Sequence, residues 1–282
     1  MRSHGKGRTD GRMKGYILSL MMLMLMSVIS IYAADAVAQK QQAHSLLQKQ
    51  FYTEKTAYFL DDMAQDVRYV LRLDYPSNSA QLVFRENLAV NKSQFLANYS
   101  SFLGNFSQTT NTNVSFAYSD PLGIEVSNGL TYLSNFTNQR VDLYNMTGGP
   151  AAVAAYYISI NSSQERSAVL PISFVGSGTY VWINYTDLAK PAKSFVDSGF
   201  VDPTALSTYE IKYGAGRSVF LSLGLVDGRQ NAYRLEQSGI LAVAGHSLEV
   251  NCTAPGSLYA FYTLPLNITL PGSGFTGRLP AR

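Results

Sequence analysis

Cysteine is almost absent from this chain of 282 residues, which contains Cys252 alone. An intramolecular disulfide is therefore impossible, and a single thiolate cannot build a zinc site of the cysteine type. Histidine is also scarce, and only His44 and His246 follow the basic N-terminal stretch. The chain has no phosphate-binding glycine loop and no complete nucleophile motif. We therefore expect no metal site, no cofactor and no enzymatic activity.

Net charge is lacking over most of the chain. The formal charge is +3, but the first fifteen residues hold five Lys or Arg against one Asp. From Gln39 onward the chain has seventeen basic and seventeen acidic residues. A neutral region of this size offers no basic surface to a phosphate backbone. We expect no nucleic-acid partner.

The longest uncharged apolar run extends from Tyr16 to Ala33. As a helix it would cover roughly 27 Å, close to the hydrocarbon thickness of a bilayer. The run predicts contact with a lipid bilayer through residues 16–33. Because the basic residues precede it, the positive-inside rule predicts a single-pass cell-membrane protein with residues 1–15 as a cytosolic tail and the C-terminal domain outside.

Residues 16–38 allow two interpretations, which both export the rest of the chain. As a signal-anchor, the segment stays in the membrane with Tyr16 and Tyr32 at its ends, where interfacial aromatic residues are typical. As a signal peptide, it is cleaved after Ala36-Val37-Ala38, before Gln39. The apolar core is longer than that of a usual signal peptide, which favours the anchor.

A helical stalk is predicted over residues 39–75. Residues 39–74 contain no glycine or proline, and Pro76 ends the helical pattern. The first half is polar almost all round, whereas the second half carries an apolar stripe. We expect this stripe to pack against the globular part of the protein. Its members are Phe59, Leu60, Met63, Val67, Val70 and Leu71.

Residues 76–282 predict a β-rich glycosylated ectodomain. A helix is expected at 94–106, packed through an aromatic stripe of Phe95, Tyr99, Phe102 and Phe106, with Leu103 on the same face. After it the apolar pattern alternates, and Asp227-Gly228 fits a two-residue hairpin turn. Strands are expected at 80–84, 114–118, 140–146, 153–160, 169–175, 180–185, 209–213, 218–226, 232–236, 240–244, 248–252, 258–264 and 266–270, followed by a loose tail. The predicted fold class is α+β: an N-terminal transmembrane and stalk helix, then a mainly antiparallel β-sandwich-like ectodomain.

Asn-x-Ser/Thr sequons are the strongest functional signal. About 2.7 would be expected by chance, and ten are present, all on the side predicted to be exported. Together they predict an exported chain with several N-linked glycans. The candidate glycosylation sites are Asn91, Asn98, Asn105, Asn113, Asn135, Asn145, Asn161, Asn184, Asn251 and Asn267.

Three of these sequons recur every seven residues, at Asn91, Asn98 and Asn105. Seven residues are nearly two helical turns, so the three asparagines share one helix face. That face lies roughly 70° from the middle of the expected aromatic stripe. Glycans would leave from the flank of the packed surface.

The first quarter of the chain resembles archaeal type IV pilin-like proteins. The features are a short basic leader ending in Lys14-Gly15, an apolar helix beginning at Tyr16, and a β-rich head with sequons. The resemblance implies cleavage between Gly15 and Tyr16 and assembly through the apolar helix. The family usually has glutamate at the fifth position of the mature helix, where this chain has Leu20. A minor or pseudopilin-like subunit, or a plain membrane-anchored archaeal surface glycoprotein, fits this difference better than a major pilin.

The sequence thus supports three functional hypotheses. The first is a membrane-anchored extracellular glycoprotein with a structural or adhesive cell-surface role. The second is a pilin-like assembly subunit, and the third is a surface carbohydrate-binding module or carbohydrate-active enzyme. Expected partners are the lipid bilayer and, beyond it, other surface proteins or further copies of the chain.

Overall fold

Helix α1 (Asp10–Leu71) opens the computed structural model of the chain. The structure describes residues 10–71, 81–86, 88, 92–110, 113–117, 120–135, 137–146, 153–239, 243–252, 258–270 and 273–281. Beyond Gly15, α1 contains neither glycine nor proline, so its backbone hydrogen bonds continue without a break. The expected continuity of membrane segment and stalk is confirmed. The helix starts within the segment assigned to the basic tail, and its expected end at residues 74–76 lies outside the described residues.

The chain divides into two compact units, Met1–Lys55 and Thr56–Arg282. The last turns of α1 belong to the second unit, where Met63 and Val67 are buried. Phe59 packs edge-on against Phe106 with 5.3 Å between the ring centroids. The predicted packing of the stalk's second half is confirmed for Met63 and Val67. The side chains of Val70 and Leu71 lie outside the described part.

One sheet of the second unit has five strands in the order β1-β13-β6-β8-β9. Neighbouring strands are antiparallel, except for the parallel pair β6 and β8. The strands are β1 (Gln81–Glu86), β6 (Val153–Ser162), β8 (Thr179–Asp187), β9 (Phe195–Val201) and β13 (Val243–Cys252).

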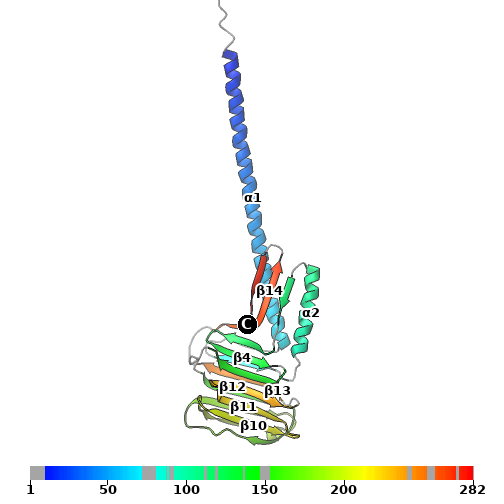
Figure 1. The fold of residues 1–282 in the computed structure, drawn as a ribbon, viewed down its shortest axis with the longest axis vertical. Helices are drawn as coiled ribbons and strands as arrows, with labels where there is room; N and C mark the ends of the chain where they lie inside the picture. Colours follow the sequence, from blue (N-terminus) through cyan, green and yellow to red (C-terminus); the bar gives the residue numbers. More distant parts are fainter. Residues whose placement is uncertain are drawn as a thin grey trace, which may run out of the picture. The chain divides into compact units, whose positions relative to one another are not determined.

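The other sheet has ten strands, all paired antiparallel, in the order β15-β14-β3-β4-β5-β12-β11-β10-β7, with β2 paired to β14. Its bounds are β2 (Asn113–Phe116), β3 (Leu122–Val126), β4 (Leu130–Asn135), β5 (Arg140–Asn145), β7 (Arg166–Leu170), β10 (Leu206–Tyr213), β11 (Ser218–Val226), β12 (Arg229–Ser238), β14 (Ala260–Leu270) and β15 (Ser273–Ala281). Helix α2 (Lys92–Thr110) precedes β2, and the short helix η1 (Pro191–Lys193) follows β8. In Figure 1 the labels β4, β12, β11 and β10 follow one another down the view, in the order in which these strands occur in the ten-stranded sheet.

The two sheets pack face to face through side chains that alternate along each strand. Phe84 of β1 stacks on Tyr132 of β4 with 4.3 Å between the centroids. Tyr156 of β6 contacts Tyr233 of β12 at 6.0 Å. Such contacts bury one face of each sheet, as in a β-sandwich. The predicted fold class, α+β with a mainly antiparallel sandwich-like domain, is confirmed.

The Asp227-Gly228 hairpin is also confirmed. Both residues have positive φ, 50° and 76°, which a type I′ turn requires. The flanking residues Val226 and Arg229 face each other in the ladder.

Several strand predictions were wrong or incomplete. Strands β3, β4 and β9 were missed, and β7 ends at Leu170 rather than continuing to residue 175. Ranges 248–252 and the described end of 240–244 form one strand, β13, and ranges 258–264 and 266–270 fall in β14. The proline in β14, Pro265, sits beside a register shift, where an irregular ladder tolerates it. The predicted loose tail forms β15, which pairs with β14.

The predicted helix at 94–106 exists as α2. Of the predicted face, Leu103 is buried and Phe106 packs against Phe59, but the buried side of the helix is turned away from Phe95 and Phe102. Leu96 and Leu103 are 0% and 3% exposed, whereas Phe95 and Phe102 are 47% and 56% exposed. The leucines therefore face the core, and two members of the expected aromatic stripe point to the surface. The predicted face included Leu103 but not Leu96, although two leucines one heptad apart mark an apolar face of a helix.

Candidate functional site

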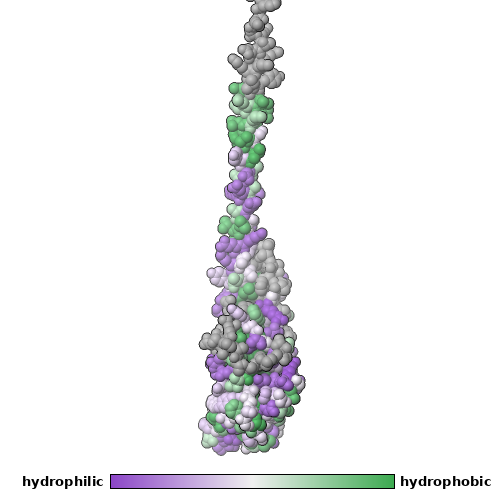
Figure 2. All heavy atoms as spheres, turned by 90° about the vertical axis from the view of Figure 1, so that its left-hand side faces the viewer, coloured by the Kyte–Doolittle hydropathy of each residue, from purple (hydrophilic) through white to green (hydrophobic). Residues whose placement is uncertain are grey.

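The apolar segment of α1 exposes its side chains all round. Every residue from Leu18 to Ala33 is exposed, and this part of the helix is mostly green in Figure 2. By length and composition α1 can cross a membrane. The hydroxyl of Ser27 donates to the carbonyl of Leu23 at 2.8 Å, which satisfies this polar group without water.

Helix α2 carries two sequon asparagines on its open side. Asn98 and Asn105 are exposed. They lie about 160° around the helix from the buried pair Leu96 and Leu103, at 100° per residue. This placement is farther from the packed face than the flank position expected from the aromatic stripe. Asn91 lies outside the described residues.

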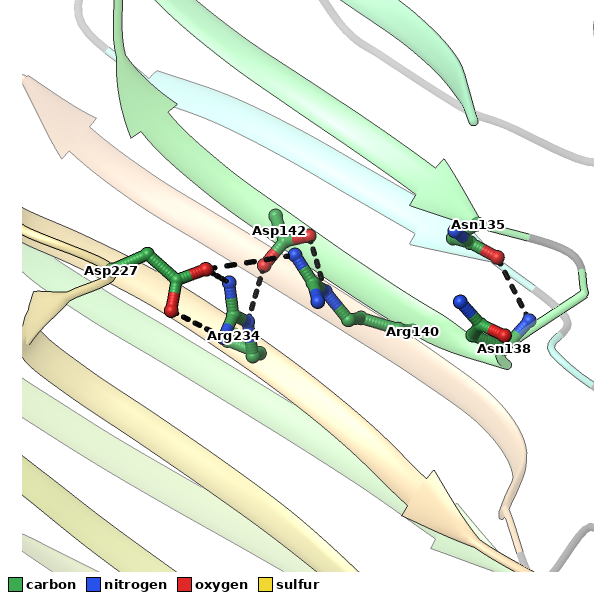
Figure 3. A network of polar contacts seen from close by, with 6 residues as sticks. All are labelled: Asn135, Asn138, Arg140, Asp142, Asp227 and Arg234. Atoms are coloured by element: carbon green, nitrogen blue, oxygen red, sulfur yellow. Dashed lines mark hydrogen bonds and ion pairs between the residues drawn. The ribbon is translucent and has the colours of Figure 1, made fainter. Parts of the chain in front are cut away.

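Three further sequons lie on the sheets' margins. Asn113 begins β2 and is exposed, while Asn135 and Asn145 end β4 and β5 and are half-buried. The side-chain oxygen of Asn135 accepts a hydrogen bond from the backbone N–H of Asn138 at 2.8 Å, which closes the β4–β5 turn (Figure 3). Asn267 lies in β14, and its side chain falls outside the described part.

The remaining three sequons share one surface with a group of aromatic rings. Side chains alternate along β6 and β8, so Ile158 and Ile183 enter the core while Tyr157 and Trp182 face outward. The rings of Tyr157 and Trp182 lie 6.4 Å apart, and Tyr180 and Phe200 lie 5.6 Å apart. We call Tyr157, Tyr180, Trp182 and Phe200 the aromatic face. Asn161, Asn184 and Asn251 occupy the same side of the five-stranded sheet.

A group of charged and polar side chains is buried between the two sheets. The Lys92 ammonium contacts Glu86, which also accepts hydrogen bonds from Ser134 and, at 2.7 Å, from the hydroxyl of Tyr132. Glu86 and Lys92 are 4% and 1% exposed. Burial lowers the pKa of Lys92, and the adjacent carboxylate opposes that effect. Each oxygen of Glu86 is therefore compensated, as a buried charge requires.

His246 lies opposite Glu86 in the β1–β13 ladder. Its Nε2 is 2.5 Å from the hydroxyl of Tyr233, and its Nδ1 is buried with no hydrogen-bond partner among the described residues. Burial, together with the nearby charge of Lys92, lowers the pKa of His246 to about 3. The imidazole is therefore neutral at neutral pH. Because His246 is 4% exposed, it faces the interior of the sandwich and not solvent.

A charged network covers part of the outer face of the ten-stranded sheet (Figure 3). Asp142 accepts from Arg234 Nε at 2.6 Å on one oxygen and from Arg140 Nε at 2.7 Å on the other. Arg234 also reaches Asp227 in the hairpin turn at 3.1 Å. Hydrogen bonding to Arg234 lowers the pKa of Asp227. The network ties β5 to β12 and to the turn of the neighbouring hairpin.

Features typical of a catalytic or metal centre are not found among the described residues. No group of three or more His, Cys, Asp or Glu there could hold a metal ion. A shallow depression of 490 Å³ lies at the β3–β4 turn and is lined by Glu125, Asn128 and Met146 among others. Cys252 is half-buried, accepts a hydrogen bond from Asn128 at 3.6 Å, and burial raises its pKa. A thiol of this kind is poorly reactive.

Sequence reasoning identified the apolar segment and the sequons, but it missed the aromatic face and the buried Glu86 group. The predicted strands 153–160 and 180–185 do contain Tyr157 and Trp182. The missing information was the pairing of β6 with β8, which brings the two rings together. Comparison of the chain with models of protein families, with characterised proteins and with solved structures gave no match.

Proposed function

We propose that the chain is a membrane-anchored extracellular glycoprotein with a structural or adhesive role at the cell surface. The observation that carries the proposal is that two parts of the chain expose different kinds of side chain. The apolar segment of α1 exposes side chains suited to lipid, and the sandwich presents its sequons to solvent. Eight sequon asparagines have a described exposure, and none of the eight is buried. An oligosaccharide can be accommodated only at such surface positions.

Orientation follows from charge in this proposal. The five basic residues before the apolar segment stay on the cytosolic side, and residues 39–282 are exported. Protease added to intact cells should digest the sandwich while a cytosolic marker protein stays whole. Survival of the sandwich until the membrane is opened would contradict the orientation.

Glycosylation is tested by mapping glycopeptides of the protein isolated from its host. We expect several of the ten sequons to be occupied, including Asn98 and Asn105, because both lie opposite the packed face of α2. Ser100 is half-buried and completes the Asn98 sequon. Ser100→Ala removes this sequon and should lower the mass of the protein by one glycan. Ten bare asparagines would remove the main support for a surface glycoprotein.

Whether the apolar segment remains as an anchor is decided by the mature N-terminus. Mass spectrometry of the first peptide should find Met1 for a signal-anchor. Gln39 would indicate a cleaved signal peptide, and Tyr16 would indicate pilin-like processing. The anchor proposal predicts Met1, together with retention of the protein in washed membranes.

A pilin-like assembly subunit is the second candidate, and exposed apolar residues beyond the membrane segment favour it. Leu47 and Phe51 are exposed one helical turn apart on α1. Such a stripe has no role in a solitary stalk but could pack against the same helix of another copy.

Cysteine cross-linking separates the two candidates. In a Cys252→Ser background, Phe51→Cys should form disulfide-linked dimers under mild oxidation if the helices assemble. Lys49→Cys, on the opposite side of the helix, is the matched control and should stay monomeric. If neither variant cross-links in membranes, the solitary anchored glycoprotein is favoured.

A further inference from the structure

The aromatic face is a cluster of four rings on the outer side of the five-stranded sheet, where Glu249 lies opposite Tyr157 and Ser198 lies opposite Trp182. Tyr180 and Phe200 are opposite residues on β8 and β9, and Tyr157 and Trp182 are opposite residues on β6 and β8. Phe200 is 40% exposed, and Val196, on the same side of β9, is 61% exposed. Of the strands that carry these rings only β9 is an edge strand, so the four rings form one cluster that extends from the edge onto the outer face of the sheet, where Tyr157, Tyr180 and Trp182 are half-buried. A contiguous apolar cluster on a surface is typical of a site that receives a partner.

The polar residues around these rings identify the chemistry of that partner. Asn184 follows Trp182 by two residues on β8, so the two side chains leave the same face about 7 Å apart. Ser159 lies beside Asn184 on β6, and Val196 lies beside it on β9. The small serine leaves room next to the asparagine, and Tyr157 lies two residues before Ser159 on β6, on the same face of the sheet.

Sugar rings suit a surface of this composition. The C–H groups on one face of a pyranose carry partial positive charge, and the face of an aromatic ring is negative. Stacking of the two covers apolar surface and adds weak C–H contacts, while the sugar hydroxyls remain in water. A protein side chain or lipid tail would cover the rings equally well but would not account for the adjoining sequons at Asn184, Asn161 and Asn251.

We propose that an N-linked glycan on Asn184 folds back over the aromatic face and stacks on Trp182 and Tyr157. The inference rests on the proposed function, since it requires Asn184 to be glycosylated. It goes further than the proposed function because it gives this glycan a fixed position. The sugar would cover the partly exposed rings of the aromatic face. The glycan at Asn251, on the far side of the same face, would flank it.

The fluorescence of Trp182 tests the proposal directly, because it is the only tryptophan in the chain. The full-length protein is isolated from its host in detergent, and quenching of its emission by acrylamide is measured. In Asn184→Gln we expect the quenching constant to rise roughly twofold, since loss of the sugar uncovers much of an indole of large area. Thr186→Ala destroys the same sequon while keeping Asn184 and should give the same increase.

Asn98→Gln is the matched control, because it removes a sequon on α2 and should leave the quenching unchanged. Glycopeptide mapping of the same samples separates the possible failures. If Asn184 is occupied but quenching is equal in the parent and both variants, the stacking inference is wrong and the glycoprotein proposal stands. If Asn184 is bare while other sequons are occupied, the inference is likewise wrong. If all sequons are bare, both proposals fail.

Two other occupants would also overturn the inference. Shielding of Trp182 that persists in Asn184→Gln and is lost on dilution would show that a second copy of the chain covers the face. Quenching that falls in Asn184→Gln only when free monosaccharide is added would show a binding site for external carbohydrate.

Discussion

In a water-soluble protein apolar side chains are usually buried and charged side chains are usually exposed. The apolar segment of α1 departs from this distribution by exposing apolar side chains, and the core of the sandwich departs from it by burying charged ones. In α1, leucine, isoleucine and methionine between Leu18 and Ile31 are exposed. In the sandwich, Glu86, Lys92 and His246 are buried. Each departure is stable only if a specific neighbour compensates it: hydrocarbon for the exposed segment, and paired charges with hydrogen bonds for the buried group.

The apolar segment of α1 and the core of the sandwich are therefore suited to different surroundings. The exposed segment requires no contact with the rest of the chain, since its backbone N–H and C=O groups form hydrogen bonds within the helix. The buried group depends on four strands and a helix, because its members come from β1, β4, β12, β13 and α2. Substitutions should therefore affect membrane association in one region and folding stability in the other.

The largest effect is expected from Glu86→Ala, which leaves the Lys92 ammonium buried without a counter-charge. Removing one partner of a buried pair costs about 3–5 kcal/mol of unfolding free energy. Thermal or denaturant unfolding of the full chain in detergent measures this loss. Glu86→Leu combined with Lys92→Met is the control, because it removes both charges. If the double variant is as unstable as Glu86→Ala, the pair does not account for the loss.

Next is Leu25→Arg, in the middle of the exposed apolar segment. A charge at the centre of a membrane helix costs roughly 2.5–3.5 kcal/mol of insertion free energy. The fraction of the protein that remains in membranes after an alkaline wash should fall sharply. Leu46→Arg, at an exposed position of α1 beyond the segment, should change nothing. Equal retention of both variants would mean that the segment is not in lipid.

Val67→Asp should destabilise the sandwich by at least the roughly 1.5–3 kcal/mol that burial of such a side chain contributes. It places a charge where the last turns of α1 pack. The melting temperature should drop well below that of Gln48→Asp, which lies on the exposed half of α1. Similar melting temperatures would show that the packing of these turns adds nothing to stability.

Acid should weaken the sandwich through His246. Its pKa is about 3 when folded against 6.5 as a model value, so between these limits the unfolded chain binds the extra proton. Stability is therefore full above pH 6.5 and falls by about 1.4 kcal/mol for each pH unit below it. The facing groups are Tyr233, which contacts the ring, Glu86, which lies opposite His246 in the ladder and pairs with Lys92, and Lys92, whose charge opposes protonation. In His246→Phe the slope of stability between pH 6.5 and 5 should be shallower, and an unchanged slope would disprove this role.

Asp142→Asn should have the smallest effect, about 1–2 kcal/mol of unfolding free energy, because solvent reaches the Arg140 and Arg234 partners. Molar salt should remove part of this difference by screening, because the side chain of Arg140 is 32% exposed, although Asp142 itself is buried. The loss caused by Glu86→Ala should persist in the same salt. Equal salt sensitivity would remove the distinction between the buried and the outer charges.

Local rules predicted the features that depend on neighbouring residues. Helical spacing placed Met63 and Val67 on a packed face, and turn chemistry placed Asp227 and Gly228 in a hairpin. The buried Glu86 group and the aromatic face depend on pairings between distant strands, such as β1 with β13. No local pattern fixes such a register, because it is chosen by the packing of the complete sandwich. The exposure of Phe95 and Phe102 on α2 likewise depends on how the helix packs in the complete fold.

The pairing of β1 with β13 has a consequence for the order of events during synthesis. Gln81 faces Asn251, and in the other sheet β2 and β3 pair with β14. Strands β1, β2 and β3 are synthesised early, but they cannot pair with β13 and β14 until these two strands, near the C-terminus, have been synthesised. Closing such long loops slows folding to roughly milliseconds to seconds, and open strand edges attract other chains meanwhile. If Asn98 and Asn105 are glycosylated as proposed, sugars attached early there would keep the nascent chain soluble until β13 and β14 are synthesised.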